Sequence, residues 1–253
     1  MVSCRGWRRW RHGLAVLGTP DEGGYKKKRM GALAMHGVIF DLDGTLVNTL
    51  EDIAGAANAV LAQAGWPAHE TAAYRAFVGN GVVRLLERAA PGVRGEGLAE
   101  LVASYRRAYA ARGHRSSVLY PGVVEVLSAL RARGLLCAVH TNKPQEWAEA
   151  LLDNLCIRGK FAMVLGAEAG FADKPDPAGA LHIAASLGLT SREMFFVGDS
   201  STDMETARAA AMCAVGVSWG FRAAEELYAS GAHRVVATPE GLLEFLRVSE
   251  NCG

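Results

Sequence analysis

Short apolar runs alternate with helical patterns along most of the chain, and this alternation limits the possible folds more than any other feature. The first run, residues 37–40, is continuous and stops at a polar loop, as a strand buried on both faces does. Later runs cover 135–140, 161–165, 194–197, 213–217 and, more weakly, 234–237, and helical patterns at 123–133, 146–155, 177–187 and 202–211 separate them. This order predicts an α/β fold in which helices cover both faces of a parallel sheet.

The alternation is interrupted between residues 49 and 120, where helical patterns occur without a convincing strand. Two apolar stripes with helical spacing run through this region: Ile53, Ala57, Val60, Leu61 and Ala64, and then Leu98, Leu101, Val102, Tyr105 and Tyr109. We therefore expect a helical cap domain over 49–118, inserted into a core domain formed by 35–48 and 119–253.

Positive charge is concentrated in the first 34 residues. They hold eight Lys or Arg and two Asp or Glu, a net charge of +6, whereas residues 35–253 hold nineteen and twenty-four, a net charge of −5. We expect 1–34 to be a basic extension that is disordered or precedes the true start at Met30 or Met35, with a targeting peptide as the alternative.

The remaining body is mildly acidic, which predicts no nucleic-acid partner, because binding to phosphates needs a broad positive surface. No apolar run approaches the roughly 20 residues that a membrane-spanning helix needs. The sequence therefore predicts a cytoplasmic protein without a membrane partner, present as a monomer or a small homo-oligomer.

Two acidic residues follow the first predicted strand. Asp41 and Asp43 are two positions apart in extended chain, so their side chains should point into the same cleft. Two carboxylates so near to each other repel, so a positive charge beside them is needed to keep both ionised. Mg²⁺, which prefers carboxylates together with phosphate oxygens and waters, is a candidate. The alternative interpretation is an ordinary polar turn at the end of a strand.

Further polar residues follow other predicted strands. The hydroxyl of Thr141, with the backbone N–H groups of Asn142 and Lys143, could bind phosphate oxygens, and Lys174 precedes two prolines, Pro175 and Pro177, that restrict the chain before the next helix. Each of these residues alone would more often be an ordinary turn or surface residue. Because ligands gather beyond the carboxyl ends of parallel strands, their shared position favours a site.

Asp199, at the end of the run 194–197, is a predicted metal ligand. Asp203 is ambiguous. Thr202 and Glu205 form a capping-box pattern, so Asp203 either belongs to the first turn of a helix or supports the metal site.

The ordered set D-x-D-G-T, then T, then K-P, then G-D-x-x-x-D resembles the haloacid dehalogenase superfamily of phosphohydrolases over residues 36–247. The resemblance implies a Rossmann-like core, a helical cap and Mg²⁺ as the cofactor. It implies that Asp41 attacks phosphorus to form an aspartyl-phosphate, that Asp43 is the acid and base, and that Thr141 and Lys174 hold the phosphoryl oxygens. The metal would be bound by Asp41, the backbone carbonyl of Asp43, and Asp199.

Several phrases are similar to those of phosphoglycolate phosphatases, notably residues 77–82, 120–123, 141–144 and 197–200. In the first of them, the glycines could bring backbone N–H groups close to a small carboxylate. Gly79, Asn80 and Gly81 are predicted substrate-binding residues, together with Asn142 of the third phrase. Arg84 and Arg88 are cationic residues that could bind the same group, with solvated helix surface as the alternative. Other open interpretations are a phosphatase for a sugar phosphate, a nucleotide or pyrophosphate, a phosphosugar mutase, and a non-catalytic binding protein.

Overall fold

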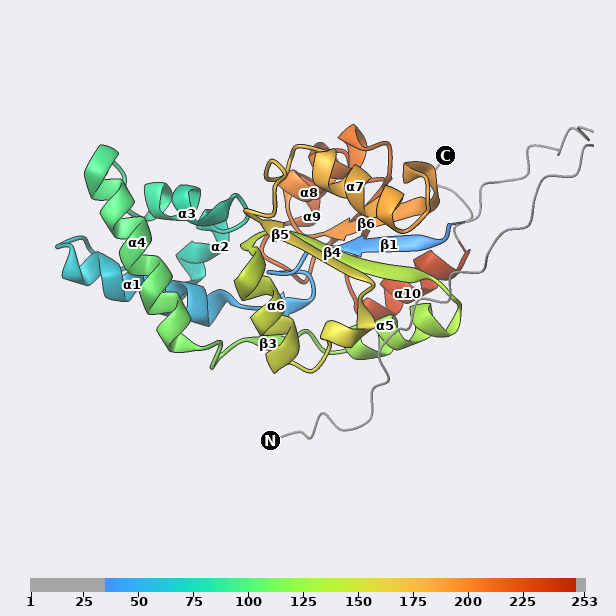
Figure 1. Cartoon of the computed structure of the whole chain (residues 1–253), viewed down its shortest axis with the longest axis horizontal. Coiled ribbons are helices and arrows are strands. Elements are labelled where there is room, and N and C mark those ends of the chain that lie inside the picture. The colour runs from blue at the N-terminus through green and yellow to red at the C-terminus, as the bar shows by residue number, and fades with distance from the viewer. Residues whose placement is uncertain (1–34, 249–253) are drawn as a thin grey trace, which may run out of the picture.

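The computed structural model describes residues 35–248, so the predicted basic extension 1–34 lies outside the described residues. A six-stranded sheet forms the centre of the molecule, in the order β5-β4-β1-β6-β7-β8, and all its pairings are parallel (Figure 1). Its strands are β1 (Gly37–Phe40), β4 (Leu136–Pro144), β5 (Met163–Ala167), β6 (Met194–Gly198), β7 (Cys213–Val217) and β8 (Arg234–Val236). The sheet predicted from the alternation is confirmed.

Strand β1 explains why helices cover both faces of this sheet. Successive side chains of a strand point to opposite faces, and here Val38 and Phe40 join one apolar cluster while Ile39 joins another. The first cluster includes α5 (Val123–Ala132), α6 (Gln145–Asn154) and α10 (Pro239–Val248), and the second includes α7 (Ala178–Ser186), α8 (Ser201–Ala209) and α9 (Ala224–Ala229). The two groups of helices lie on opposite sides of the sheet (Figure 1).

The segment between β1 and α5 is largely helical and has an apolar cluster of its own. It contains α1 (Leu50–Gln63), α2 (Tyr74–Phe77), α3 (Gly81–Ala89) and α4 (Gly95–Arg112), together with the short 3-10 helix η1 (Thr71–Ala73). Two further 3-10 helices, η2 (Arg158–Lys160) and η3 (Ser191–Glu193), lie outside this segment. Helices α1 to α4 lie beyond one end of the sheet, as a cap would (Figure 1). A cap domain over 49–118 stays our proposal.

A two-stranded antiparallel ribbon joins the entry and the exit of this segment. Strand β2 (Val47–Asn48) pairs with β3 (Val118–Leu119), although no strand was expected between residues 49 and 120. That expectation was wrong at 118–119, because two residues are too few to show the alternation that marks a strand.

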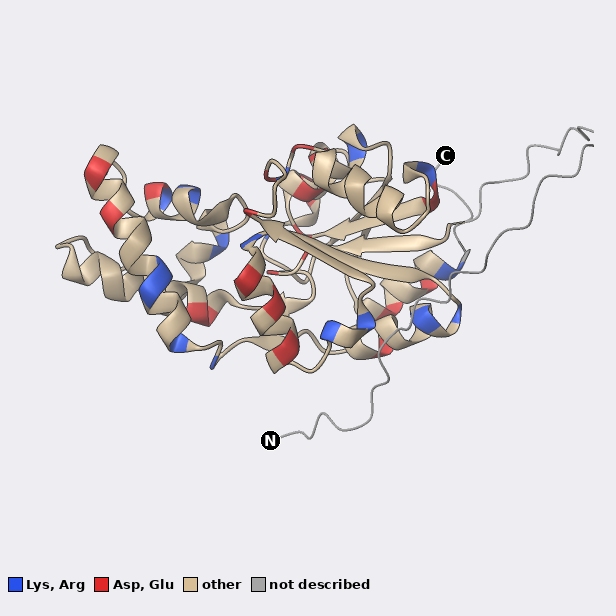
Figure 2. Cartoon of the chain, viewed as in Figure 1, with Lys and Arg blue, Asp and Glu red and all other residues tan. Residues whose placement is uncertain are grey.

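Charged residues of both signs lie on the outer helices, whereas the strands of the sheet are largely uncharged (Figure 2). In the part of the chain that the structure describes, no helix combines the length and the apolar character needed to cross a bilayer.

Candidate active site

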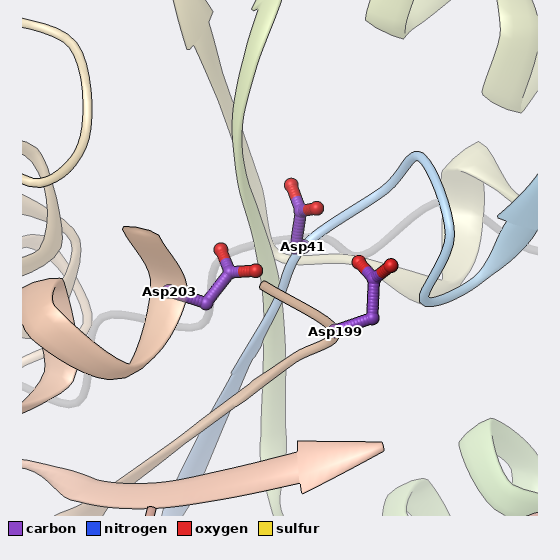
Figure 3. Close-up of side chains that lie close together, drawn as sticks. All are labelled: Asp41, Asp199 and Asp203. Atoms are coloured by element: carbon purple, nitrogen blue, oxygen red, sulfur yellow. The ribbon is translucent and has the colours of Figure 1, made fainter. Parts of the chain in front are cut away.

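Three buried carboxylates meet at the carboxyl end of the sheet. Asp41 follows β1, Asp199 follows β6, and Asp203 lies in the first turn of α8. One oxygen of each lies within 4.8 Å of the others, and Figure 3 shows the three carboxylates converging. Strands β1 and β6 are neighbours, and the N–H of Asp41 donates to the carbonyl of Val197 at 2.8 Å. Adjacent strands therefore bring together residues more than 150 positions apart in the sequence.

Lys174 lies against this acidic cluster from the segment before α7. Its Nζ donates to Asp41 Oδ1 at 2.7 Å and to Asp203 Oδ1 at 2.6 Å, and the lysine is buried. Burial alone would lower the pKa of Lys174, but Asp203 and Asp41 outweigh it and raise this pKa. The lysine is therefore held as a cation, in the place that the sequence predicted.

The surroundings of Asp199 fix its carboxylate. Thr45 donates to Oδ1 at 3.2 Å, and the N–H of Phe221 donates to Oδ2 at 2.7 Å. A Cβ at Gly44 would lie 2.3 Å from Asp199 Oδ2, and Gly44 has a φ of +89°, so a side chain there would be strained and would displace the carboxylate. The glycine and threonine of the D-x-D-G-T phrase thus hold an acid located far along the chain.

The acidic cluster fits a divalent cation. Burial raises the pKa of Asp41 to about 7 despite Lys174, with a further rise from Asp203. Burial, then Asp203 and Asp41, raise the pKa of Asp199 well above its ordinary value. Lys174 neutralises one of three negative charges and contacts Asp41 and Asp203. A hard cation of charge two, bound by carboxylate oxygens, would balance the remainder.

Asp203 is both a helix cap and a member of the cluster. Its Oδ2 accepts two hydrogen bonds from Ser200, from the hydroxyl at 2.6 Å and from the backbone N–H at 3.1 Å. Its Oδ1 accepts from the ammonium of Lys174. The capping box is formed by Ser200 and Asp203, so the predicted Thr202 and Glu205 pair was wrong. The cap lies at Ser200, two residues before the predicted Thr202, and helix α8 begins at Ser201.

Asp43 lines the same cavity as Asp41 but has a different partner. The Nζ of Lys143 lies 3.0 Å from Asp43 Oδ1 and 3.2 Å from Oδ2. Sequence reasoning considered only the backbone N–H of Lys143, which in fact donates to Thr141 Oγ1 at 3.3 Å. A signal was present, since Lys143 follows Thr141 by only two positions at the end of the same predicted strand, where ligands gather.

The comparisons with known proteins agree with this geometry. A model of haloacid dehalogenase-like hydrolases matches residues 38–217. The chain belongs to the haloacid dehalogenase-like hydrolase family. Phosphoglycolate phosphatase of Pseudomonas putida is 36% identical over 212 residues, 81% of this chain and 78% of the relative. Phosphoglycolate phosphatase of Yersinia pestis is 38% identical over 208 residues, 81% of this chain and 90% of the relative.

Solved structures give the same result. A predicted phosphoglycolate phosphatase from Haemophilus somnus has a TM-score of 0.77 at 28% identity, covering 83% of this chain and 97% of that one. The match includes the fold as well as the sequence. As predicted, this haloacid dehalogenase-like hydrolase is a phosphoric monoester hydrolase.

In this hydrolase the side chain of Asn142 holds the chain on both sides of the cavity. Its amide nitrogen donates to the carbonyls of Gly79 at 3.1 Å and of Lys174 at 3.0 Å, and its oxygen accepts from the N–H of Lys174 at 2.8 Å. These contacts occupy both donor hydrogens of the side-chain amide. The predicted role of its backbone N–H in binding phosphate stays a proposal.

The predicted cap residues separate into two sets. Gly79 and Gly81 line the active cavity, and both have positive φ, +117° and +80°, which suits glycine. Asn80 lies in a neighbouring cavity, where its amide donates to Thr202 Oγ1 at 2.8 Å and its oxygen accepts from Arg88 at 2.8 Å. Asn80 thus joins the helical segment to the core rather than lining the active cavity.

Arg84 lies outside the active cavity. Its side chain is 67% exposed and pairs with Glu87 at 2.7 Å, one helical turn away on α3. Arg88 also lies outside it and donates to the carbonyl of Phe77 at 3.0 Å. The structure therefore gives Arg84 the alternative interpretation of helix surface, while Arg88 binds the segment before α3; the face of α3 that turns inward carries Leu85 and Leu86.

Arginines also fasten the helical segment to the core. Arg75 of α2 donates to the carbonyl of Gly220 at 3.0 Å, and Arg222 of the core donates to the carbonyls of Arg75 and, at 2.9 Å, of Val78. Backbone carbonyls that end the short α2 thereby find donors. This reciprocal contact sets the position of the junction between α2 and α3, which carries Gly79 and Gly81.

Proposed function

We propose that this hydrolase is a Mg²⁺-dependent phosphatase that acts on a small phosphate monoester, with 2-phosphoglycolate as the first candidate. The observation that carries the proposal is the contact of Lys174 with Asp41 beside Asp199 and Asp203. This arrangement offers a nucleophile, a fixed cation for phosphoryl oxygens and a set of oxygen ligands for a metal.

In the proposed reaction, a carboxylate oxygen of Asp41 attacks phosphorus and the bond to the ester oxygen breaks. Asp43, on the same cavity, gives its proton to the leaving oxygen and then takes one from the water that hydrolyses the aspartyl-phosphate. Lys174 and the hydroxyl of Thr141 hold the phosphoryl oxygens. Mg²⁺, bound by Asp41, Asp199 and the carbonyl of Asp43, would supply positive charge to the transition state.

The substrate assignment draws on two supports. The curated relatives are named phosphoglycolate phosphatases, and the active cavity is small, with an apolar lining from residues such as Val78, Leu85 and Trp147. A cytoplasmic location and the monomeric or small homo-oligomeric state stay predictions.

A panel of phosphate esters assayed with Mg²⁺ tests the proposal. We expect phosphate release from 2-phosphoglycolate to exceed release from sugar phosphates, nucleotides and pyrophosphate, and EDTA to abolish it. Similar rates across the panel would overturn the substrate while leaving a phosphatase. Conversion of one sugar phosphate isomer into another would point to a mutase, and no turnover of any ester would point to a binding protein.

A further inference from the structure

The active cavity has a cation that is not needed for the phosphoryl group. Among the described residues that line this cavity, Lys143 is the only one with a cationic side chain. Lys174 is engaged by Asp41 and Asp203 at the acidic cluster, and Arg84 points to solvent. A substrate with a second anionic group would therefore meet Lys143.

The ammonium of Lys143 is fixed from two sides. It contacts both carboxylate oxygens of Asp43, at 3.0 and 3.2 Å, and it donates to the hydroxyl of Tyr109 at 2.7 Å. It also lies 4.7 Å from the centre of the Tyr109 ring, close enough for a cation–π contact. Lys143 is buried, and a buried ammonium is costly unless it is paired and hydrogen-bonded. These contacts supply such partners and fix the position of the ammonium.

Tyr109 brings this contact from the helical segment. It belongs to α4, and its ring stacks on Trp147 of α6 with centroids 4.7 Å apart. The ammonium therefore lies where the cap and the core meet, away from the acidic cluster.

The positions of Thr141 and Lys143 suit a short substrate. Both residues line the active cavity, and they are two positions apart in β4. A two-carbon acid joined to phosphate through one oxygen can place its phosphate at Thr141 and its carboxylate at Lys143.

We propose that Lys143 binds the carboxylate of the substrate and thereby selects phosphorylated short acids; this inference rests on the proposed function. A carboxylate that arrives from the cavity competes with Asp43 for the N–H donors of the ammonium. Binding of the acid end thus loosens Asp43 from Lys143 and leaves it free to reach the leaving oxygen. A neutral substrate of the same length gives no such release.

A matched pair of substrates tests this role. 2-Phosphoglycolate and 2-hydroxyethyl phosphate have the same length and differ in the acid group. For Lys143→Met we expect the ratio of their kcat/KM values to fall about 30-fold, the scale of one lost hydrogen bond to a charged group. Lys143→Arg should restore part of the ratio. Tyr109→Phe, which keeps the ammonium, should lower both values together and leave the ratio within about threefold.

The outcomes separate the inference from the function on which it rests. If Lys143→Met slows both substrates equally, Lys143 only positions Asp43 and the inference is overturned. If the wild-type protein shows no preference for 2-phosphoglycolate, the proposed function fails and the inference falls with it. Thermal unfolding of each variant checks its fold, and Lys143→Gln, which keeps a polar group, is the second variant should the methionine protein fail to fold.

Discussion

The two sides of the active cavity are built in different ways. On the core side, Asp41 and Asp199 follow parallel strands, and Lys174 reaches both Asp41 and Asp203 from a third segment. On the cap side, Gly79 and Gly81 lie at the junction of α2 and α3, which is held by arginine contacts to carbonyls. Pairing of neighbouring strands brings residues at the strand ends together. The cap residues belong to a separate group of helices, and side-chain contacts with the core fix their position. The comparison predicts that losses of chemistry come from the strand-end carboxylates of the core, and losses of selectivity from Lys143, where the core meets the cap.

The largest effect is expected from Asp41→Asn. The amide keeps the size of the side chain but cannot act as the nucleophile, so kcat should fall by at least about a thousandfold. Steady-state assays with 2-phosphoglycolate measure this, with thermal unfolding as the check on the fold. Asp153→Asn, a change at an exposed acid on α6, is the matched control. Substantial turnover by Asp41→Asn would refute the nucleophile assignment.

Asp199→Asn should remove the response to the metal. Mg²⁺ at a hundred times its dissociation constant would stabilise the wild-type protein by about 2.7 kcal/mol, because it relieves repulsion within the acidic cluster. The variant should lose most of this stabilisation, while Asp153→Asn should keep it. Thermal unfolding with and without Mg²⁺ measures the difference independently of turnover. An unchanged shift in Asp199→Asn would place the metal elsewhere.

The same contrast explains how much could be predicted from the sequence. The sheet and the positions of Asp41, Lys174 and Asp199 follow from apolar runs and the rule that ligands gather at strand ends. The side-chain partner of Asp43 was missed because Lys143 has the pattern of a strand residue, and its contact with Tyr109 depends on how α4 docks. The choice between the two interpretations of Arg84 stayed open because helical spacing does not tell which polar face turns toward a neighbour.

His140, on β4 but outside the lining of the active cavity, is expected to affect the pH dependence of stability. It is buried beside Gly179, burial and then Lys174 lower its pKa to about 3, and no described residue hydrogen-bonds its Nδ1. Below pH 6.5 the imidazole of His140 binds a proton in the unfolded chain but stays neutral in the folded protein. Stability is therefore complete above pH 6.5 and should fall by about 1.4 kcal/mol per pH unit toward pH 3.

The variant His140→Leu should lack this acid-side loss, because leucine does not titrate. Urea unfolding of both proteins at pH 7.5 and pH 5 measures the change. The wild-type protein should lose stability relative to the variant at pH 5. Equal differences at the two pH values would show that His140 takes up no proton on unfolding in this range.

The smallest effect is expected from Arg84→Gln. Because the guanidinium is exposed and paired with Glu87, its loss should change kcat/KM for 2-phosphoglycolate by less than about twofold. The assay is the same as for Asp41→Asn. A large rise in KM would show that Arg84 turns toward the substrate and would weaken the assignment of Lys143 as the selecting cation.

The three hydrogen bonds of Asn142 imply an order in which the cavity can come apart. Two of them hold the backbone of Lys174, and only one reaches Gly79 in the cap. Movement of the cap away from the core would break the single bond and leave the other two in place. The lysine would then keep its hold on Asp41 and Asp203 while the product leaves, so each turnover would begin from a catalytic centre that is already assembled.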